Sequence, residues 1–219
     1  TAYEIRNCDW SSDVCSSDLA AEIERLRKQL AAQHGVRVGY SGADMSKPAE
    51  VEKMIETAAA ELGGVDILVN NAGVLATGHF ADASEQRLRQ IMEVNFFAAA
   101  ELIRSAVPLL RQSACPMIVN IASISGLRAS SLRVAYGTSK AALIHLTKQQ
   151  AVELGNAGIR VNAVAPGPVD TAMAKQVHTA AIRADYHDAI PLNRYGTPEE
   201  IAARSEEHTS ELQSQFRIS

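Results

Sequence analysis

Tyr136 and Lys140, four residues apart, are the first residues whose types and spacing could do chemistry. On a helix, residues at this spacing lie one turn apart on the same face, which brings an ammonium close to a phenol. A phenol has an ordinary pKa of about 10, and a nearby positive charge favours its ionised form. The pair could therefore serve as a general acid and base, although a solvated Tyr–Lys pair is also common on ordinary helices.

Further polar residues follow short apolar runs along the chain. The sequence NNAG at residues 70–73 follows VDILV, and Ser123 follows MIVNIA. Asn95 lies between them in a stretch with helical periodicity. Each has a plain structural alternative, because Asn and Gly also suit turns and a helical Asn can simply be exposed. Their order along the chain, and not any one of them, indicates a site.

The elements that would position these residues alternate between helix and strand. Helices are expected at residues 20–34, 48–62, 84–111 and 134–154, and apolar strands at residues 36–43, 65–69, 117–121 and 159–164. Pro48 and the Gly63-Gly64 pair mark the two ends of the second helix. Short apolar strands between long helices predict one doubly wound α/β domain, with a parallel sheet covered on both faces. Such sheets bind ligands at the carboxyl ends of their strands.

The succession GGVDILVNNAG, Asn95, NIASISG, YGTSK and PGPVDT resembles the short-chain dehydrogenase/reductase family over residues 20–203. The resemblance implies a Rossmann-like fold and an NAD(P)-dependent oxidoreductase that interconverts a secondary alcohol and a ketone by hydride transfer. It implies that Tyr136 is the acid and base, and that Lys140 lowers the Tyr136 pKa and binds the nicotinamide ribose. Ser123 would donate to the substrate oxygen. Asn95 would kink its helix and hold a water of a proton relay.

The same resemblance assigns residues to the cofactor, NAD or NADP, between which the sequence does not discriminate. Asp44 resembles the acid that contacts adenine, and its alternative role is a helix N-terminal cap. The other expected cofactor contacts, besides Tyr136 and Lys140, are Asn71, Ala72, Gly73, Pro166, Gly167, Val169 and Thr171. The expected substrate-facing positions are Ser123, Leu75, Ile124, Leu127, Arg128 and Met173, a mostly apolar set in which Arg128 either attracts an anion or is simply solvated.

The two ends of the chain differ in character from its middle. Residues 9–19 can be encoded by a DNA string whose reverse complement encodes residues 204–214, and this element resembles a sequencing-library adapter. We therefore predict that residues 1–19 and 204–219 are non-native, adapter-like segments around a partial domain at residues 20–203. On this interpretation the first two strands, the glycine-rich pyrophosphate turn and the last strand of the family's sheet are missing. The strand at residues 36–43 should then be detached from the strand at residues 65–69, or pair with it in a non-native way.

Composition narrows the remaining possibilities. The chain has 219 residues, is 47% hydrophobic and carries a formal charge of −4, without a basic stripe for nucleic acid. It has no apolar run of the roughly 20 residues that a membrane span needs, and its three cysteines lack zinc-like spacing. We expect a cytoplasmic enzyme with a small-molecule substrate, no metal and, from the resemblance, a homodimer or homotetramer. A non-catalytic nucleotide-binding regulator, and a chain that is inactive as it stands, remain alternatives.

Overall fold

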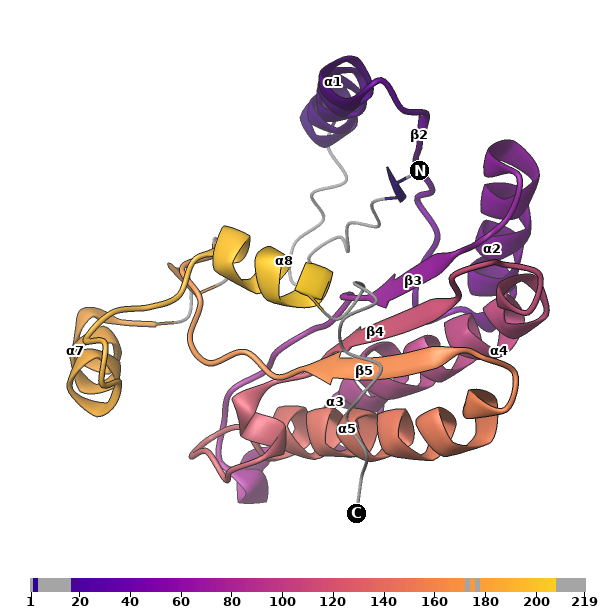
Figure 1. Cartoon of the computed structure of the whole chain (residues 1–219). Helices are drawn as coiled ribbons and strands as arrows, with labels where there is room; N and C mark the ends of the chain where they lie inside the picture. The colour runs from indigo at the N-terminus through magenta and orange to yellow at the C-terminus, as the bar shows by residue number, and fades with distance from the viewer. Residues whose placement is uncertain (1, 4–16, 172–173, 176–177, 208–219) are drawn as a thin grey trace.

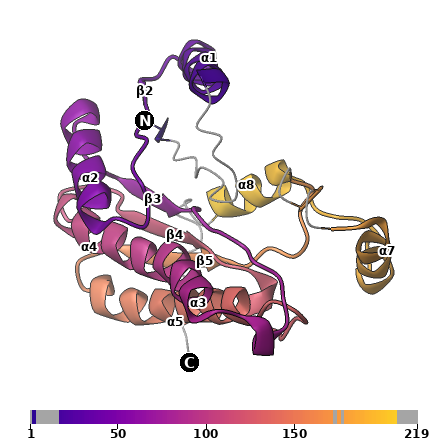
Figure 2. The ribbon, with the colours of Figure 1, turned by 180° about the vertical axis from the view of Figure 1, so that it is seen from behind.

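Three parallel strands form the centre of the structure, a computed structural model that describes residues 2–3, 17–171, 174–175 and 178–207. The strands are β3 (Ile67–Asn70), β4 (Met117–Ile121) and β5 (Arg160–Val164), in the order β3-β4-β5. Figures 1 and 2 both show the helices α2, α3, α4 and α5 on one side of this sheet. The α/β class and the parallel sheet are therefore confirmed.

The alternation of side chains along β4 divides the core into two layers. Ile118 belongs to the larger apolar cluster, which includes Leu102 and Ile103 of α4 (Ala98–Leu110). Met117 and Val119 belong to a smaller cluster, against which Ile201 of α8 (Pro198–Glu207) packs. Because successive side chains of a strand point to opposite faces, α4 and α8 cover opposite faces of the sheet.

The strand β3 departs from the expected double coverage. Leu68 is buried on the α4 side, whereas Ile67 and Val69 are 47% and 46% exposed. The covering of the α8 side thus reaches β4 and β5 but leaves these two apolar side chains of β3 accessible. The prediction of a sheet covered on both faces fails at this strand.

Helix α2 (Pro48–Leu62) has the predicted bounds, because local signals set both ends. Pro48 occupies the first turn, where its missing N–H costs no hydrogen bond. Gly63 follows the last turn in the left-handed conformation, at φ 93°, and donates its N–H to the carbonyl oxygen of Ala59. Between them, Val51, Met54 and Ile55 recur at helical spacing and are buried.

The helix predicted for residues 84–111 is interrupted in the structure. Ser84 caps α3 (Glu85–Met92) by accepting a hydrogen bond from the N–H of Arg87. A π-helical segment, η2 (Glu93–Phe97), separates α3 from α4. Asn95 lies in this segment, so the expected distortion of the helix at Asn95 is present. Helix α5 (Val134–Gly155) agrees closely with its predicted range.

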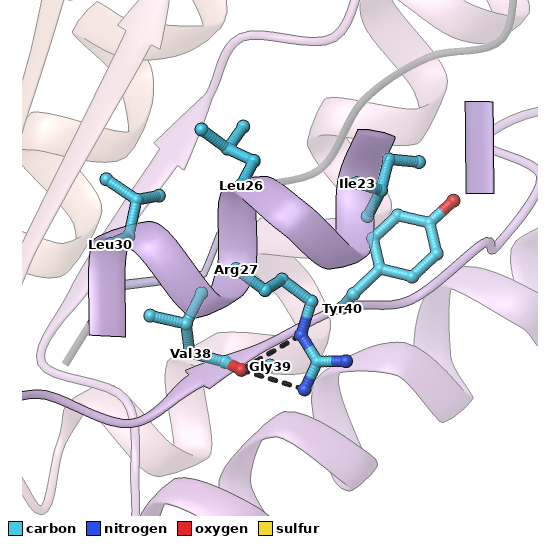
Figure 3. A pocket seen from close by; sticks show the side chains of 7 residues that line it. All are labelled: Ile23, Leu26, Arg27, Leu30, Val38, Gly39 and Tyr40. Carbon is cyan, nitrogen blue, oxygen red and sulfur yellow. Dashed lines mark hydrogen bonds between the residues drawn. The ribbon is translucent and has the colours of Figure 1, made fainter. Parts of the chain in front are cut away.

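The N-terminal elements form a separate unit. Helix α1 (Ser17–His34) is followed by β2 (Val38–Gly39), which pairs with β1 (Ala2–Tyr3) in a two-stranded sheet. Arg27 of α1 donates two hydrogen bonds, of 3.1 and 3.0 Å, to the carbonyl oxygen of Val38 (Figure 3). The predicted strand at residues 36–43 is thus short and is detached from β3, one of the two arrangements expected for an incomplete sheet.

Helix α1 begins before residue 20 and α8 extends beyond residue 203, so both helices cross the boundaries predicted for the adapter-like segments. Most of those segments lies outside the described residues. Between β5 and α8 the chain forms α7 (Ala180–Ala189), which Figure 1 shows at a distance from the sheet. Over the described parts of the chain, no helix combines the length and the apolarity that crossing a bilayer requires.

Candidate active site

The carboxyl ends of β3, β4 and β5 bring three loops to one edge of the sheet. Asn70 is in register with Asn120, and Ile121 is in register with Val164. The N–H of Ile124 donates to the carbonyl oxygen of Pro166 at 2.9 Å, which joins the loops that follow β4 and β5. The predicted residues of the NNAG, NIASISG and PGPVDT motifs therefore lie at a common edge.

A row of buried amides and a hydroxyl anchors this edge to α5. Asn70 Nδ2 donates to Asn120 Oδ1 at 2.7 Å, and Asn120 Nδ2 donates to Thr147 Oγ1 at 2.9 Å. Thr147 Oγ1 in turn donates to the carbonyl oxygen of Leu143. Asn120 and Thr147 were not selected from the sequence, although Asn120 is the polar residue inside the apolar strand MIVNI.

Asn95 connects the loop after β3 to α5. Its side chain is buried, and its Oδ1 accepts the N–H of Val74 at 2.7 Å. Its Nδ2 donates to the carbonyl oxygen of Val74 at 2.9 Å and to Ser139 Oγ at 3.0 Å. Both amide hydrogens are thereby used, and one lone pair of Oδ1 remains for a water. Ser139 Oγ donates at 2.7 Å to the carbonyl oxygen of Tyr136, so Asn95 also fixes the turn of α5 that carries the tyrosine.

Lys140 is almost completely buried, with 4% of its surface exposed. Its Nζ donates to the carbonyl oxygen of Ile121 at 2.8 Å, and burial lowers its pKa from 10.5 to about 8. A Cβ added to Gly73 would lie 3.4 Å from Lys140 Nζ and 3.4 Å from Asn95 Oδ1. The NNAG loop therefore lies directly against the ammonium, and glycine is the residue that leaves this approach open.

Tyr136 lies on the same face of α5 as Lys140. The Lys140 Nζ is 6.0 Å from the centroid of the Tyr136 ring, the outer limit of a cation–π contact. The tyrosine is half-buried, and its hydroxyl has no hydrogen-bond partner among the residues that the structure describes. The predicted juxtaposition of phenol and ammonium is present, with the phenol hydroxyl available to a ligand.

Ser123 caps the short helix η3 (Ile124–Gly126) that follows β4. Its Oγ accepts the N–H of Ser125 at 3.2 Å. Two glycines bring this loop against α5: a Cβ on Gly126 would lie 2.7 Å from the carbonyl carbon of Lys140, and a Cβ on Gly137 would lie 2.9 Å from the carbonyl oxygen of Ser125. Gly126 and Gly137 were not selected from the sequence, although both stand inside the motifs NIASISG and YGTSK.

Asp44 makes local contacts of the kind expected of a turn residue. Its Oδ1 accepts the N–H and the hydroxyl of Ser46, and its Oδ2 lies 3.5 Å from Lys47 Nζ. The neighbours of Asp44 in sequence, Ala43 and Met45, belong to the same apolar cluster as Ala72 and Val74. The contacts of the Asp44 side chain are thus those of a residue that stabilises the turn before α2, which is close to its alternative role as a helix cap.

The loop after β5 is supported by the segment that precedes α8. The N–H of Gly196 donates to the carbonyl oxygen of Pro168 at 3.0 Å. The N–H of Asp170 donates to the carbonyl oxygen of Gly196 at 2.9 Å. Thr171 Oγ1 accepts the N–H of Ala174, so it too serves a local turn.

The predicted substrate-facing residues follow the strand ends, and they remain predictions. Leu75 is half-buried, whereas Ile124 and Leu127 are exposed apolar residues beside Ser123. Arg128 is exposed on the same loop. Met173 lies outside the described residues.

The pocket of Figure 3 lies between α1 and β2, and its lining contains no predicted site residue. Ile23, Leu26, Arg27 and Leu30 of α1 line it together with Val38, Gly39 and Tyr40, and Arg27 hydrogen-bonds to the Val38 carbonyl oxygen. Among the described residues, no three or more Asp, Glu, His or Cys side chains are grouped to hold a metal ion.

A parallel sheet with helices on its faces and its strand ends at one edge defines a Rossmann-like α/β fold. A family model described as enoyl-(acyl carrier protein) reductase matches residues 11–205. The chain belongs to the short-chain dehydrogenase/reductase family, and it is an NAD(P)-dependent oxidoreductase that acts on CH–OH groups.

Individual relatives agree with this assignment. The D-β-hydroxybutyrate dehydrogenase of Cupriavidus necator is 36% identical over 85% of this chain and 76% of its own length. The 3-oxoacyl-[acyl-carrier-protein] reductase of Chlamydia muridarum is 33% identical over 80% of this chain and 70% of its own. The ligand-free aldohexose dehydrogenase of Thermoplasma acidophilum has a similar structure, with a TM-score of 0.75 at 29% identity, over 80% of this chain and 72% of that chain.

Proposed function

We propose that this oxidoreductase interconverts a secondary alcohol and a ketone, with Tyr136 as its acid and base. Three polar residues assist Tyr136: Asn95, Ser123 and Lys140. The observation that carries the proposal is the buried Lys140 ammonium beside the Tyr136 ring, at the edge where the strand ends meet. The contact places an ammonium, which only donates hydrogen bonds, beside the phenol that would exchange a proton with the substrate. A non-catalytic regulator would not need such a pair.

In alcohol oxidation, Tyr136 takes the proton of the substrate hydroxyl, and in ketone reduction it returns that proton. The hydroxyl hydrogen of Ser123 has no acceptor among the described residues, so it is available to the substrate oxygen and stabilises negative charge there. Lys140 uses one of its three donors for Ile121 and keeps two for a ligand. When bound, the nicotinamide supplies or accepts the hydride.

The residues present fit the nicotinamide half of the cofactor better than its pyrophosphate. Gly73 has no side chain to separate the NNAG loop from Lys140 Nζ, so a ribose bound beside this loop would lie next to the ammonium. Pro166, Gly167 and Val169 would hold the carboxamide side. Residues 1–34 contain no glycine, and we assign no residue of this chain to the pyrophosphate. We expect weak binding of NAD(H) and NADP(H) by the chain as it stands.

The substrate class that we propose is a small, largely apolar molecule with its oxygen on an internal carbon. The exposed apolar residues Ile124 and Leu127 flank Ser123, and two of the relatives are named for hydroxybutyrate and for 3-oxoacyl chains. A cytoplasmic location and a homodimeric or homotetrameric assembly are part of the same proposal, the first from composition and the second from the family.

The experiment is to assay 3-hydroxybutyrate oxidation and acetoacetate reduction with NAD(H) and NADP(H), at cofactor concentrations high enough to offset weak binding. Tyr136→Phe should abolish turnover and leave cofactor binding largely unchanged, because the ring remains and only the proton carrier is lost. Thr138→Ala, an exposed change in the same turn of α5, is the matched control and should retain activity. Turnover by Tyr136→Phe close to that of the parent would exclude Tyr136 as the acid and base.

A further inference from the structure

His178 joins two parts of the chain that are far apart in sequence. Its Nε2 lies 2.8 Å from Nη2 of Arg133, the residue immediately before α5. Its Nδ1 lies 2.9 Å from the hydroxyl of Tyr195, in the segment that leads to α8. No part of the proposed reaction uses these three residues.

The partners of His178 determine its charge. A guanidinium only donates hydrogen bonds, so Nε2 of the imidazole must accept one from Arg133. The remaining ring hydrogen is then on Nδ1 and donates to Tyr195. This arrangement exists for the neutral imidazole alone, because a protonated ring would present an N–H to the guanidinium. Burial, together with the charges of Arg133 and Arg183, also lowers the pKa of His178.

Tyr195 is the centre of a compact aromatic cluster. It is 5% exposed, and the guanidinium of Arg183 lies 4.4 Å from its ring centroid. The rings of His187 and Tyr186 stand nearly perpendicular to it at 5.6 and 5.9 Å. Arg183 also pairs with Asp170 at 2.9 Å. The side chains of His178, Arg183, Tyr186, His187 and Tyr195 therefore tie residues 178–196 together, and the Arg133–His178 hydrogen bond connects this segment to the start of α5.

This unit supports the loop expected to hold the nicotinamide. Gly196 exchanges backbone hydrogen bonds with Pro168 and Asp170, and it bridges to Val169. At the other contact, the carbonyl oxygen of Arg133 accepts the N–H of Gly137 at 2.7 Å, in the first turn of α5 beside Tyr136. The hydrogen bond to His178 thus links the two sides of the site.

We propose that Arg133, His178 and Tyr195 are positioning residues that hold residues 178–196 against the start of α5, and that protonation of His178 releases this hold. That these residues position an active site rests on the proposed function. The contact between residues 178–196 and the start of α5 does not depend on it. The charges of Arg133 and Arg183 both disfavour protonation of His178, and Asp170 is paired with Arg183 and Lys175. The charged and titratable groups around His178 and its partners are Arg133, Arg183, Tyr186, Tyr195, His187, Lys175 and Asp170.

The direction of the pH effect follows from the lowered pKa. While the Arg133–His178 hydrogen bond is present, the pKa of His178 lies below its ordinary value. Once this bond is broken, His178 takes up a proton near the ordinary histidine pKa of about 6.5. The hold is therefore complete above about pH 6.5 and weakens as the pH falls below it.

The test is hydrogen exchange of the whole chain at about pH 7.5 and about pH 5.5, on either side of the histidine pKa and corrected for intrinsic exchange rates. Protection of residues 178–196 should fall about fivefold or more at the lower pH, the effect of one lost charge-assisted hydrogen bond. Residues 48–62 of α2 serve as the internal reference and should change less. Because exchange needs no turnover, its outcome is independent of the proposed function.

Two variants separate the mechanism from general acid unfolding. His178→Gln retains an acceptor for Arg133 but cannot be protonated, so its protection should not depend on pH in this range. Arg133→Met should show the low protection at both pH values, and Arg128→Met, on the same loop, is the control that should behave like the parent. The proposal is overturned if the parent shows no pH dependence in 178–196, if His178→Gln retains that dependence, or if Arg133→Met leaves protection unchanged.

Discussion

The buried ammonium of Lys140 raises the free energy of the folded chain, and methionine, which has a similar length and no charge, removes this cost. Burial lowers the Lys140 pKa from 10.5 to about 8. A shift of this size corresponds to about 3 kcal/mol of destabilisation while the lysine is protonated in both states. Against this, Lys140→Met leaves the carbonyl oxygen of Ile121 without its donor, at a cost of about 1 to 3 kcal/mol. The net gain at pH 7 is therefore small, on the order of 1 kcal/mol.

The difference in stability between Lys140→Met and the parent should depend on pH, and this dependence tests the burial of Lys140 better than the size of the difference does. The folded state loses its proton near pH 8, whereas the unfolded state retains it up to 10.5, so the stability of the parent rises with pH between these values. Of the burial penalty of about 3 kcal/mol at pH 7, about 1 kcal/mol remains at pH 10. The stability of Lys140→Met relative to the parent should thus fall by about 2 kcal/mol over this interval.

Urea unfolding of both proteins at the two pH values measures this change. Groups that titrate identically in parent and variant cancel in the difference, so alkaline ionisation elsewhere does not obscure it. Lys148→Met, on the same helix but exposed, is the matched control and should show no comparable change. A stability difference between Lys140→Met and the parent that stays constant from pH 7 to pH 10 would refute the assignment of a dry, depressed-pKa ammonium.

Three further outcomes are expected. Asn95→Leu should destabilise the chain by about 2 to 4 kcal/mol in urea unfolding, because it leaves both backbone groups of Val74 without their partner; stability like the parent's would mean that the Val74 contacts contribute nothing. Gly126→Ala should cost about 1 to 3 kcal/mol, since its Cβ would meet the backbone of α5 at 2.7 Å, whereas Gly155→Ala meets nothing within 4 Å and should be tolerated. Titration with NADH, followed by its fluorescence, should approach saturation only at high concentration, and tight binding would show that another segment receives the pyrophosphate.

Features with local causes could be predicted from the sequence. The bounds of α2 follow from Pro48 and Gly63, each of which acts through its own backbone. The spacing of Tyr136 and Lys140 determines their shared helix face without reference to any other element.

Features that depend on distant partners could not be predicted in this way. The strand expected at residues 36–43 narrows to Val38–Gly39, because a strand extends only as far as a neighbour pairs with it. The interruption of the long helix at Asn95 is expected from the family resemblance and not from helical periodicity, because the Asn95 side chain bonds Val74 from another loop. His178 showed no signal in the sequence, since its partner Arg133 belongs to a different element.

The packing that assembles the site is also the packing that desolvates Lys140. A Cβ added to Gly126 would lie 2.7 Å from the carbonyl carbon of Lys140, so the Ser123 loop packs directly against the turn of α5 that carries the lysine. If the contact is what excludes water, Gly126→Ala should readmit water and return the Lys140 pKa toward its ordinary value. The pH-dependent advantage of Lys140→Met should then be smaller in the Gly126→Ala background than in the parent, which a double-mutant cycle at pH 7 and pH 10 measures. Equal pH dependence in both backgrounds would mean that the lysine is kept dry by β4 and the NNAG loop, independently of the Ser123 loop.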